Sequence, residues 1–162
     1  MEFIELEVIR EEVYEEVDKT TDYTGSKLMD TDAGARERIA VTQTNLKDLS
    51  RFWDEACTSV QERLKEMYLG GSLPGSENFE IKLQVSVAFD KANCPGIEIM
   101  LRNYFILTIT GKWFVFANKG EAGNYETAAN SLMEDIRRKL YSRRMIRSPR
   151  KHREPAINRP LG

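Results

Sequence analysis

The chain has 162 residues, 41% of them hydrophobic, and its 24 Lys and Arg nearly balance its 26 Asp and Glu. This length and composition predict one domain with a core of ordinary size and an appended tail. No apolar run approaches the ~20 residues that a helix needs to cross a bilayer, and the acidic start lacks the basic region of a secretory signal. We expect a protein of the cytoplasm with no membrane partner, in which Cys57 and Cys94 are reduced, partly buried thiols.

The first third of the chain predicts a strand, a helix and a loop. Residues 3–8 alternate between apolar and other side chains, which is typical of a short strand. From about Arg10 the apolar spacing changes to three and four, which predicts a helix that reaches towards Gly25. The stretch 25–42 holds two glycines and an Asp-Thr-Asp cluster at 30–32. It predicts a loop with at most one helical turn.

The next segment predicts a long amphipathic helix. Apolar residues follow one another at spacings of three and four from Leu46 to Met67, which indicates a helix over 45–68 with one buried stripe. Thr42 or Thr44 is the expected N-cap. Gly70-Gly71 is the expected stop, because glycine readily adopts the left-handed conformation of a helix end.

A strand is expected over about 78–90. Residues 79–89 alternate without interruption between apolar and other side chains, which indicates a half-buried strand. A lone strand would leave its backbone donors and acceptors unpaired. It must therefore pair with 3–8, with a turn-linked strand or with another subunit, and the last possibility is an argument for oligomerisation.

The stretch 97–117 is ambiguous between helix and strand. Its composition around 104–110 suits a strand, whereas the apolar spacing from Ile97 to Phe116 and the proline at 95 suit a helix. We favour the helix and keep the strand as the alternative. Because 121–142 again shows a helical stripe, the predicted fold class is α+β and mainly helical. Three to four helices would surround one core in a domain of residues 1–142.

The C-terminal part is strongly basic. Residues 137–159 contain ten Lys or Arg and one acid, a net charge of +9, so residues 1–136 carry a net charge of −11. Three prolines and dense like charge predict that 143–162 is an extended arm with no core of its own. Such a chain is suited to binding a polyanion or an acidic surface of another copy. The predicted contact residues are Arg143, Arg144, Arg147, Arg150, Lys151, Arg153 and Arg159.

Two partners fit this arm. The acidic N-terminal segment, with eight acids and one Arg among residues 1–18, offers a complementary surface on a neighbouring copy. The phosphate backbone of DNA is the alternative. Because the arm has no aromatic residue past Tyr141, that contact would be independent of sequence and sensitive to salt.

No catalytic pattern competes with binding. The single histidine, His152, lies between prolines in the arm, whereas a hydrolytic triad needs a histidine that packed neighbours hold in place. The carboxylates from Glu11 to Asp18 lack the apolar neighbours that would raise their pKa for acid–base work. The acidic cluster at 30–32 lacks the glutamate that a calcium loop needs at the position of Val41. We expect no enzyme, no metal and no cofactor.

Four segments together resemble a known group of proteins: Tyr23-Thr-Gly-Ser-Lys27, Arg51-Phe-Trp-Asp-Glu-Ala-Cys57, Lys112-Trp-Phe-Val-Phe-Ala-Asn-Lys119 and Met133-Glu-Asp-Ile-Arg-Arg-Lys-Leu-Tyr141. In this order they resemble small structural proteins encoded by phages and prophages of gut bacteria, over roughly residues 12–145. Those proteins are similar in size to head–tail connector and neck components, and their segment matching 97–117 is helical. The resemblance implies a virion protein, assembled in the host cytoplasm as a homo-oligomeric ring beside portal or tail proteins.

Overall fold

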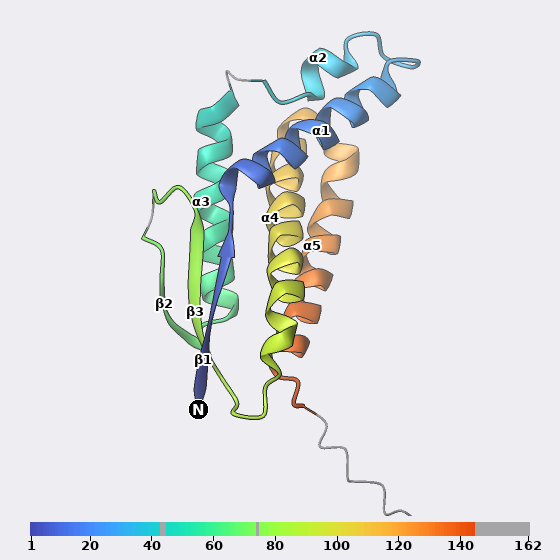
Figure 1. Cartoon of the computed structure of the whole chain (residues 1–162). Helices are drawn as coiled ribbons and strands as arrows, with labels where there is room; N and C mark the ends of the chain where they lie inside the picture. Colours follow the sequence, from blue (N-terminus) through green and yellow to red (C-terminus); the bar gives the residue numbers. More distant parts are fainter. Residues whose placement is uncertain (43–44, 74, 145–162) are drawn as a thin grey trace, which may run out of the picture.

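The computed structural model describes residues 1–42, 45–73 and 75–144 (Figure 1). The fold is mainly helical with one three-stranded antiparallel sheet, so the α+β class predicted from the sequence is confirmed. None of the helices in these ranges combines the length and apolar character needed to cross a lipid bilayer. In chain order the elements are β1 (Glu2–Val8), α1 (Arg10–Leu28), α2 (Ala35–Ile39), α3 (Leu46–Arg63), β2 (Tyr68–Gly71), β3 (Phe79–Val85), η2 (Lys91–Asn93), α4 (Cys94–Ala117) and α5 (Lys119–Leu140).

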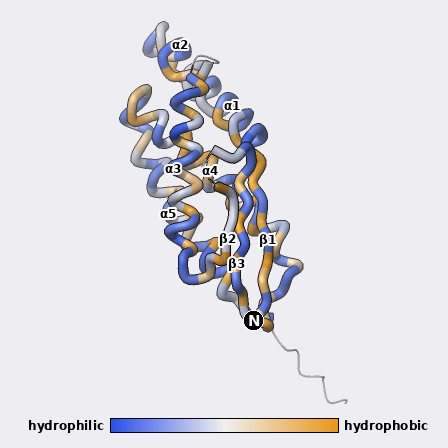
Figure 2. Tube along the Cα trace, turned by 90° about the vertical axis from the view of Figure 1, so that its left-hand side faces the viewer, coloured by the Kyte–Doolittle hydropathy of each residue, from blue (hydrophilic) through white to orange (hydrophobic). Residues whose placement is uncertain are grey.

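The sheet has the order β1-β3-β2, with β3 in the centre. The register of β1 on β3 runs from Glu2 opposite Val85 to Val8 opposite Phe79. Both strands place alternate apolar residues on the buried face, and Figure 2 shows this alternation along their traces. Because both edges of β3 are paired within the chain, its backbone gives no argument for oligomerisation. Of the pairings that the sequence left open, those with residues 3–8 and with a turn-linked strand are the ones that form.

The strand β3 is shorter than the predicted 78–90. It ends at Val85, because the Ser86 hydroxyl accepts from the Ala88 amide at 3.2 Å and the Ser86 carbonyl accepts from the Phe89 amide at 2.9 Å. These bonds form a turn in place of further sheet ladder. Val87 is 68% exposed as a result, whereas Phe89 folds back into the core.

The helix α4 lies at the centre of the molecule, between α3 and α5, and it also contacts α1 and β1 (Figure 1). Its buried residues therefore lie on several sides, which blurs the helical period in the sequence. Pro95 occupies its first turn. The stretch 97–117 is helical, as we favoured, and the strand alternative is wrong.

The helix α3 is shorter than the predicted 45–68. It ends at Arg63, although Leu64 and Met67 beyond it are still buried. The two glycines at 70–71 belong to strand β2, and a Cβ on Gly71 would collide with the backbone of Glu80. Gly71 therefore permits close contact between β2 and β3, and neither glycine ends α3, which stops at Arg63.

The N-terminal side of α3 also differs from the expectation. The residue before the helix is Asn45, whose side chain accepts hydrogen bonds from the Thr42 amide and hydroxyl, both at 2.9 Å. Thr42 is therefore not the N-cap, and Thr44 lies outside the described residues. Upstream, α1 continues to Leu28, and the predicted helical turn within 25–42 is the five-residue α2.

One hydrogen bond ties α2 to the central helix. The indole N–H of Trp113 donates to the carbonyl of Ile39 at 2.6 Å, and both residues are buried. Trp53 of α3 is also buried, with its ring 4.7 Å from that of Phe105 of α4. Both tryptophans therefore belong to the core.

Candidate functional site

The predicted basic arm begins within the described residues and continues beyond them. Arg143 and Arg144 are described, and both are exposed. The other predicted contact residues, and His152 with them, lie outside the described residues: Arg147, Arg150, Lys151, Arg153 and Arg159. The described part of the candidate site therefore consists of two features. One is the point where the arm leaves the domain, and the other is the set of acidic surfaces that could bind the arm.

Arg144 is held against the domain from which the arm leaves. Its amide donates to the carbonyl of Ala88 at 2.6 Å, and its guanidinium lies 3.3 Å from the carboxylate of Asp90. The Ala92 amide and the Arg144 guanidinium, in that order, lower the pKa of Asp90 below its ordinary value. The arm thus starts from a fixed point beside the turn that follows β3.

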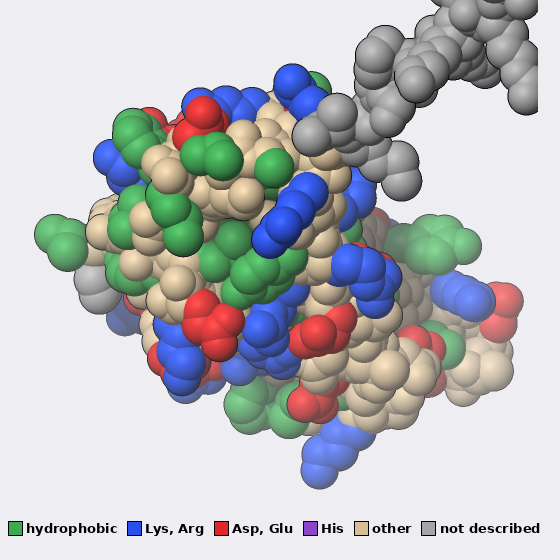
Figure 3. Space-filling model, turned by 90° about the horizontal axis from the view of Figure 1, so that it is seen from below, with side chains coloured by type: hydrophobic (Ala, Val, Ile, Leu, Met, Phe, Trp, Pro, Cys, Tyr) green, Lys and Arg blue, Asp and Glu red, His purple; other side chains and the backbone are tan. Residues whose placement is uncertain are grey.

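This point lies near the start of β1, at the lower end of the molecule in Figure 1, which Figure 3 shows from below. Arg144 lines a hollow of about 270 Å³ with Glu2, the 87–89 segment and Lys91. Lys91 forms an ion pair with Glu2 at 3.3 Å, which closes the side of this hollow next to β1. Seen from this end, the surface carries hydrophobic side chains among charges of both signs.

The acids of residues 1–18 divide into paired and unpaired groups. Glu2, Glu12 and Glu16 form ion pairs with Lys91, Arg102 and Lys19. The remaining carboxylates have no cation partner within the part of the chain that the structure describes: Glu5, Glu7, Glu11, Glu15 and Asp18. They are distributed over two different surfaces.

The first surface is the outer face of the sheet, which we call the sheet face: Glu5, Glu7, Glu80, Lys82 and Glu98. Glu7 lies directly opposite Glu80 in the register, an arrangement of like charges that destabilises a strand pair. The Glu98 carboxylate accepts from the Glu7 amide at 3.2 Å. The hollow over this face has a volume of about 470 Å³, and Leu6 and Ile81 beneath it are buried.

The second surface is a groove of about 740 Å³ between α1 and the start of α3, which we call the α1–α3 groove. Its apolar floor consists of Tyr14, Val41, Leu46 and Leu49, and its charged rim of Arg10, Glu11, Glu15, Asp18 and Glu77. The sequence pattern placed Leu46 in the buried stripe, but its side chain is 49% exposed in this groove. Glu77, which comes from the loop before β3, was not recognised from the sequence.

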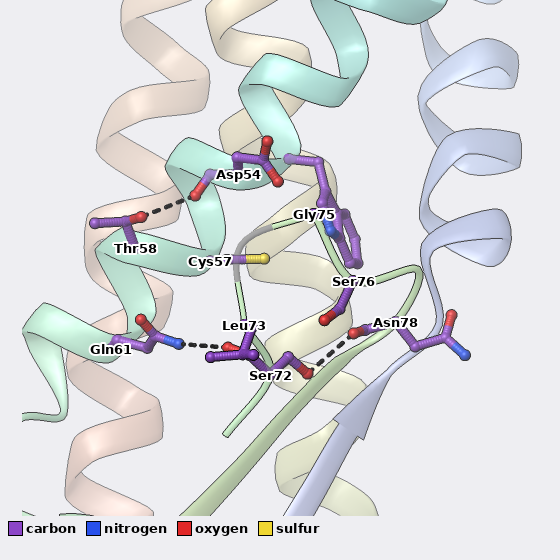
Figure 4. A pocket seen from close by; sticks show the side chains of 10 residues that line it. Asp54, Cys57, Thr58, Gln61, Ser72, Leu73, Gly75, Ser76 and Asn78 are labelled. Atoms are coloured by element: carbon purple, nitrogen blue, oxygen red, sulfur yellow. Dashed lines mark hydrogen bonds between the residues drawn. The ribbon is translucent and has the colours of Figure 1, made fainter. Parts of the chain in front are cut away.

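A small pocket beside Cys57 is the strongest candidate for a catalytic site, but its polar groups have structural roles (Figure 4). Burial first, and then the carboxylate of Asp54, raise the pKa of the Cys57 thiol to about 12, so it is not a nucleophile near neutral pH. The Thr58 hydroxyl donates to the Asp54 carbonyl at 3.0 Å. The Ser72 hydroxyl donates to the Asn78 carbonyl at 3.1 Å and accepts from the Glu80 amide at 2.7 Å.

The Thr58 bond lies within α3 and the Ser72 bonds close the segment between β2 and β3, so none of them activates a hydroxyl. The Gln61 side-chain amide donates to the Ser72 carbonyl at 3.5 Å and connects this segment to α3. The cavity of about 50 Å³ accommodates little more than water. Cys57 and Cys94 are both free thiols of intermediate burial, as expected from the sequence. Among the residues whose placement is described, no group of three or more His, Cys, Asp or Glu side chains could hold a metal ion.

Comparison with known proteins finds no match for this chain among protein families, curated proteins or solved structures.

Proposed function

We propose that this protein is a non-enzymatic structural subunit of a phage virion, and that its copies form a ring in the neck or head–tail connector. The observation that carries the proposal is the separation of opposite charges on the subunit. The basic arm leaves from Arg144 at one end, while unpaired carboxylates line the α1–α3 groove and the sheet face. The resemblance of the four sequence segments to phage structural proteins supports the virion setting.

The proposal assigns the arm, and not the sheet edge, as the main link between subunits. Pairing of two copies of β1 would bring Glu5 and Glu7 of both copies onto one face, where like charges repel. The Glu7 amide is also already bonded to Glu98 of its own subunit. The acidic side chains of β1 thus disfavour pairing of two copies of this strand. They do not hinder the binding of a basic segment such as the arm.

A docked arm must gain many contacts, because ordering its backbone costs about 1–2 kcal/mol for each residue fixed. A ring repeats one contact around a closed symmetry, so each subunit both gives an arm and receives one. Fixing Arg144 to Ala88 and Asp90 before docking lowers this cost, because this residue of the arm is already ordered.

The second candidate function is sequence-independent binding of nucleic acid by the same arm. It is favoured by the distribution of free cations at the end of α5. Arg137 and Arg138 form ion pairs with Glu134 and Asp135, whereas Arg143 beyond them has no acidic partner among the described residues. Unpaired arginines of this kind are suited to phosphate contacts.

One pair of measurements separates the two functions. Full-length protein and a variant truncated after Arg144, which keeps the Asp90 contact, are compared by sedimentation and by DNA binding across a salt series. The proposal predicts that the truncation abolishes self-assembly, and that full-length protein binds DNA too weakly to detect at physiological salt. If the truncated protein assembles as well as the full-length one while salt-sensitive DNA binding disappears, the second function replaces the first.

A further inference from the structure

We propose that the α1–α3 groove is the docking site for the arm of a second copy of this chain, within residues 145–162. An apolar arm side chain would lie on the groove floor, and arm cations would pair with the carboxylates of the rim. The inference rests on the proposed function. It specifies how subunits join, because the arm of one subunit docks in the groove of the next.

The groove offers an apolar floor that its own subunit leaves partly uncovered. Leu46 is 49% exposed there, while Leu49 and Val41 beside it are buried. Tyr14, also of the floor, packs edge-on against the buried Trp53 with ring centroids 6.2 Å apart. A preformed apolar floor of this kind can take an apolar side chain with little rearrangement.

The rim carries four carboxylates and one cation, Arg10, so its net charge is negative. Glu11, Glu15, Asp18 and Glu77 have no cation partner among the residues that the structure describes. Glu12 and Glu16 of the same helix lie outside the groove, and each has a partner, Arg102 and Lys19 respectively. The carboxylates left unpaired on α1 are therefore those that face the groove.

The arm has the complementary composition. Residues 145–162 contain five Lys or Arg and one acid, interspersed with Met145, Ile146, Ile157 and Leu161. Ile146 is followed directly by Arg147, and such a pair would place an apolar side chain on the floor and a cation at the rim.

The sheet face is also acidic, but the apolar residues that line its hollow, Leu6 and Ile81, are both buried. The exposed ring of Phe3 on the same face lies under the Lys82 ammonium, which is 3.9 Å from the ring centroid. The hollow of the sheet face therefore has no exposed apolar side chain comparable to Leu46 in the groove.

The residue from which the arm leaves, Arg144, and the α1–α3 groove lie at opposite ends of the sheet. Arg144 is fixed beside Asp90, after the C-terminal end of β3, whereas Glu77 of the groove comes before its N-terminal end. The residue from which the arm leaves therefore lies at the other end of the sheet from the groove of the same chain. A head-to-tail contact between arm and groove uses different surfaces on the two copies, and it closes into a ring when the rotation permits.

Charge reversal in the full-length chain tests this contact. The groove-reversed variant is Glu11→Lys with Glu15→Lys, and the arm-reversed variant is Arg147→Glu with Arg150→Glu. The control is Glu5→Lys with Glu80→Lys on the sheet face, which reverses the same number of charges at a hollow that has no comparable exposed apolar side chain. Glu5, Glu11, Glu15 and Glu80 are exposed, and circular dichroism verifies that each variant is folded.

Native mass spectrometry measures self-association of each protein alone and of mixtures. We expect the groove-reversed and arm-reversed variants to associate at least about tenfold more weakly than the parent, because attraction becomes repulsion at two positions. The sheet-face control should remain within about threefold of the parent. An equimolar mixture of groove-reversed and arm-reversed chains should recover association and contain both chains in equal number, since each reversed site then meets an opposite charge.

Three results would overturn the inference. The groove-reversed variant could associate as strongly as the parent, the sheet-face control could weaken association equally, or the mixture could fail to recover. An arm of 18 residues spans up to about 60 Å and can reach its own groove, and docking within one subunit would give the third result. In the first two cases the parent still assembles and the proposed function stands, whereas docking within one subunit would remove the arm as the link between subunits. A parent that stays monomeric at every concentration rejects both proposals.

Discussion

Arg144 and Asp90 connect the end of the helical domain to the turn that follows β3. The guanidinium lies 3.3 Å from the carboxylate, and the Arg144 amide donates to Ala88 in the same turn at 2.6 Å. Because one residue is held by its backbone and by its side chain, the position from which the arm leaves is defined. The function proposed for the arm depends on this geometry.

Asp90→Asn should loosen this contact without unfolding the domain. The pKa of Asp90 is lowered, so the carboxylate's contribution is complete above the ordinary value of 3.8 and is lost as the pH falls through the lower value in the folded state. We expect the Arg144 side-chain resonance to shift over that acidic range in the parent and to be insensitive to it in the variant. Arg138, which pairs with Asp135 at 3.0 Å, is the internal control and should not respond to the substitution.

Gly25 permits close contact between α1 and α2. A Cβ at this position would lie 2.7 Å from the Cα of Arg36, a backbone atom that cannot move aside cheaply. Gly25→Ala should therefore lower the free energy of unfolding by about 1–3 kcal/mol in urea denaturation. The matched control is Gly123→Ala in α5, where a Cβ meets nothing within 4 Å. That variant should gain about 0.5–1 kcal/mol, and equal effects at the two glycines would contradict the packing described.

Trp113→Phe should show how much the bond to Ile39 contributes. The substitution keeps an aromatic ring but leaves a buried carbonyl without its donor, which costs about 1–3 kcal/mol of unfolding free energy. Tyr104→Phe is the comparison, because it removes a partly buried hydroxyl that lies 2.8 Å from Ser59. Its expected cost is about 0.5–1.5 kcal/mol, since Ser59 can still reach water. A larger loss for Tyr104→Phe would contradict the anchoring role assigned to Trp113.

Cys57 should react slowly in the folded protein. Burial raises the pKa of its thiol from 9.0 to about 12, so its thiolate population at pH 8 falls about a thousandfold. In a Cys94→Ser background, alkylation by iodoacetamide at pH 8 should be at least about a hundredfold slower in native buffer than in urea. Similar rates in the two solvents would show that the pocket beside Cys57 is open to the reagent.

The same shift predicts how stability depends on pH. Because the pKa is higher in the folded state, the contribution of Cys57 is fully present below pH 9.0 and is lost as the pH rises towards about 12. The free energy of unfolding should therefore decline over this range in the parent. In Cys57→Ala the decline attributable to this thiol should be absent, and an unchanged pH profile would contradict the assignment.

The sequence predicted best those elements that bury only one of their faces. The alternation in β1 and β3 and the stripes in α1 and α5 are simple, because each element packs on one side only. The end of α3 was misplaced because Leu64 and Met67 continue the apolar stripe after the helix has ended. The α4 segment was ambiguous because a central helix is apolar on several sides.

The candidate site was only partly predictable. Net charge along the chain identified the basic arm and the acidic start, because that signal needs no tertiary structure. The groove could not be found in this way, since Glu15, Leu46 and Glu77 are brought together only by the packing of α1, α3 and the loop before β3. Nor could the sequence show that Arg144 is held by Asp90, since the two residues meet only in the folded chain.

Native mass spectrometry of the full-length protein beside the chain truncated after Arg144 tests the central claim most directly. The account predicts a closed oligomer of one defined size for the full-length protein and a monomer for the truncated one. A full-length protein that stays monomeric across all concentrations, or a truncated protein that forms the same oligomer, would contradict it.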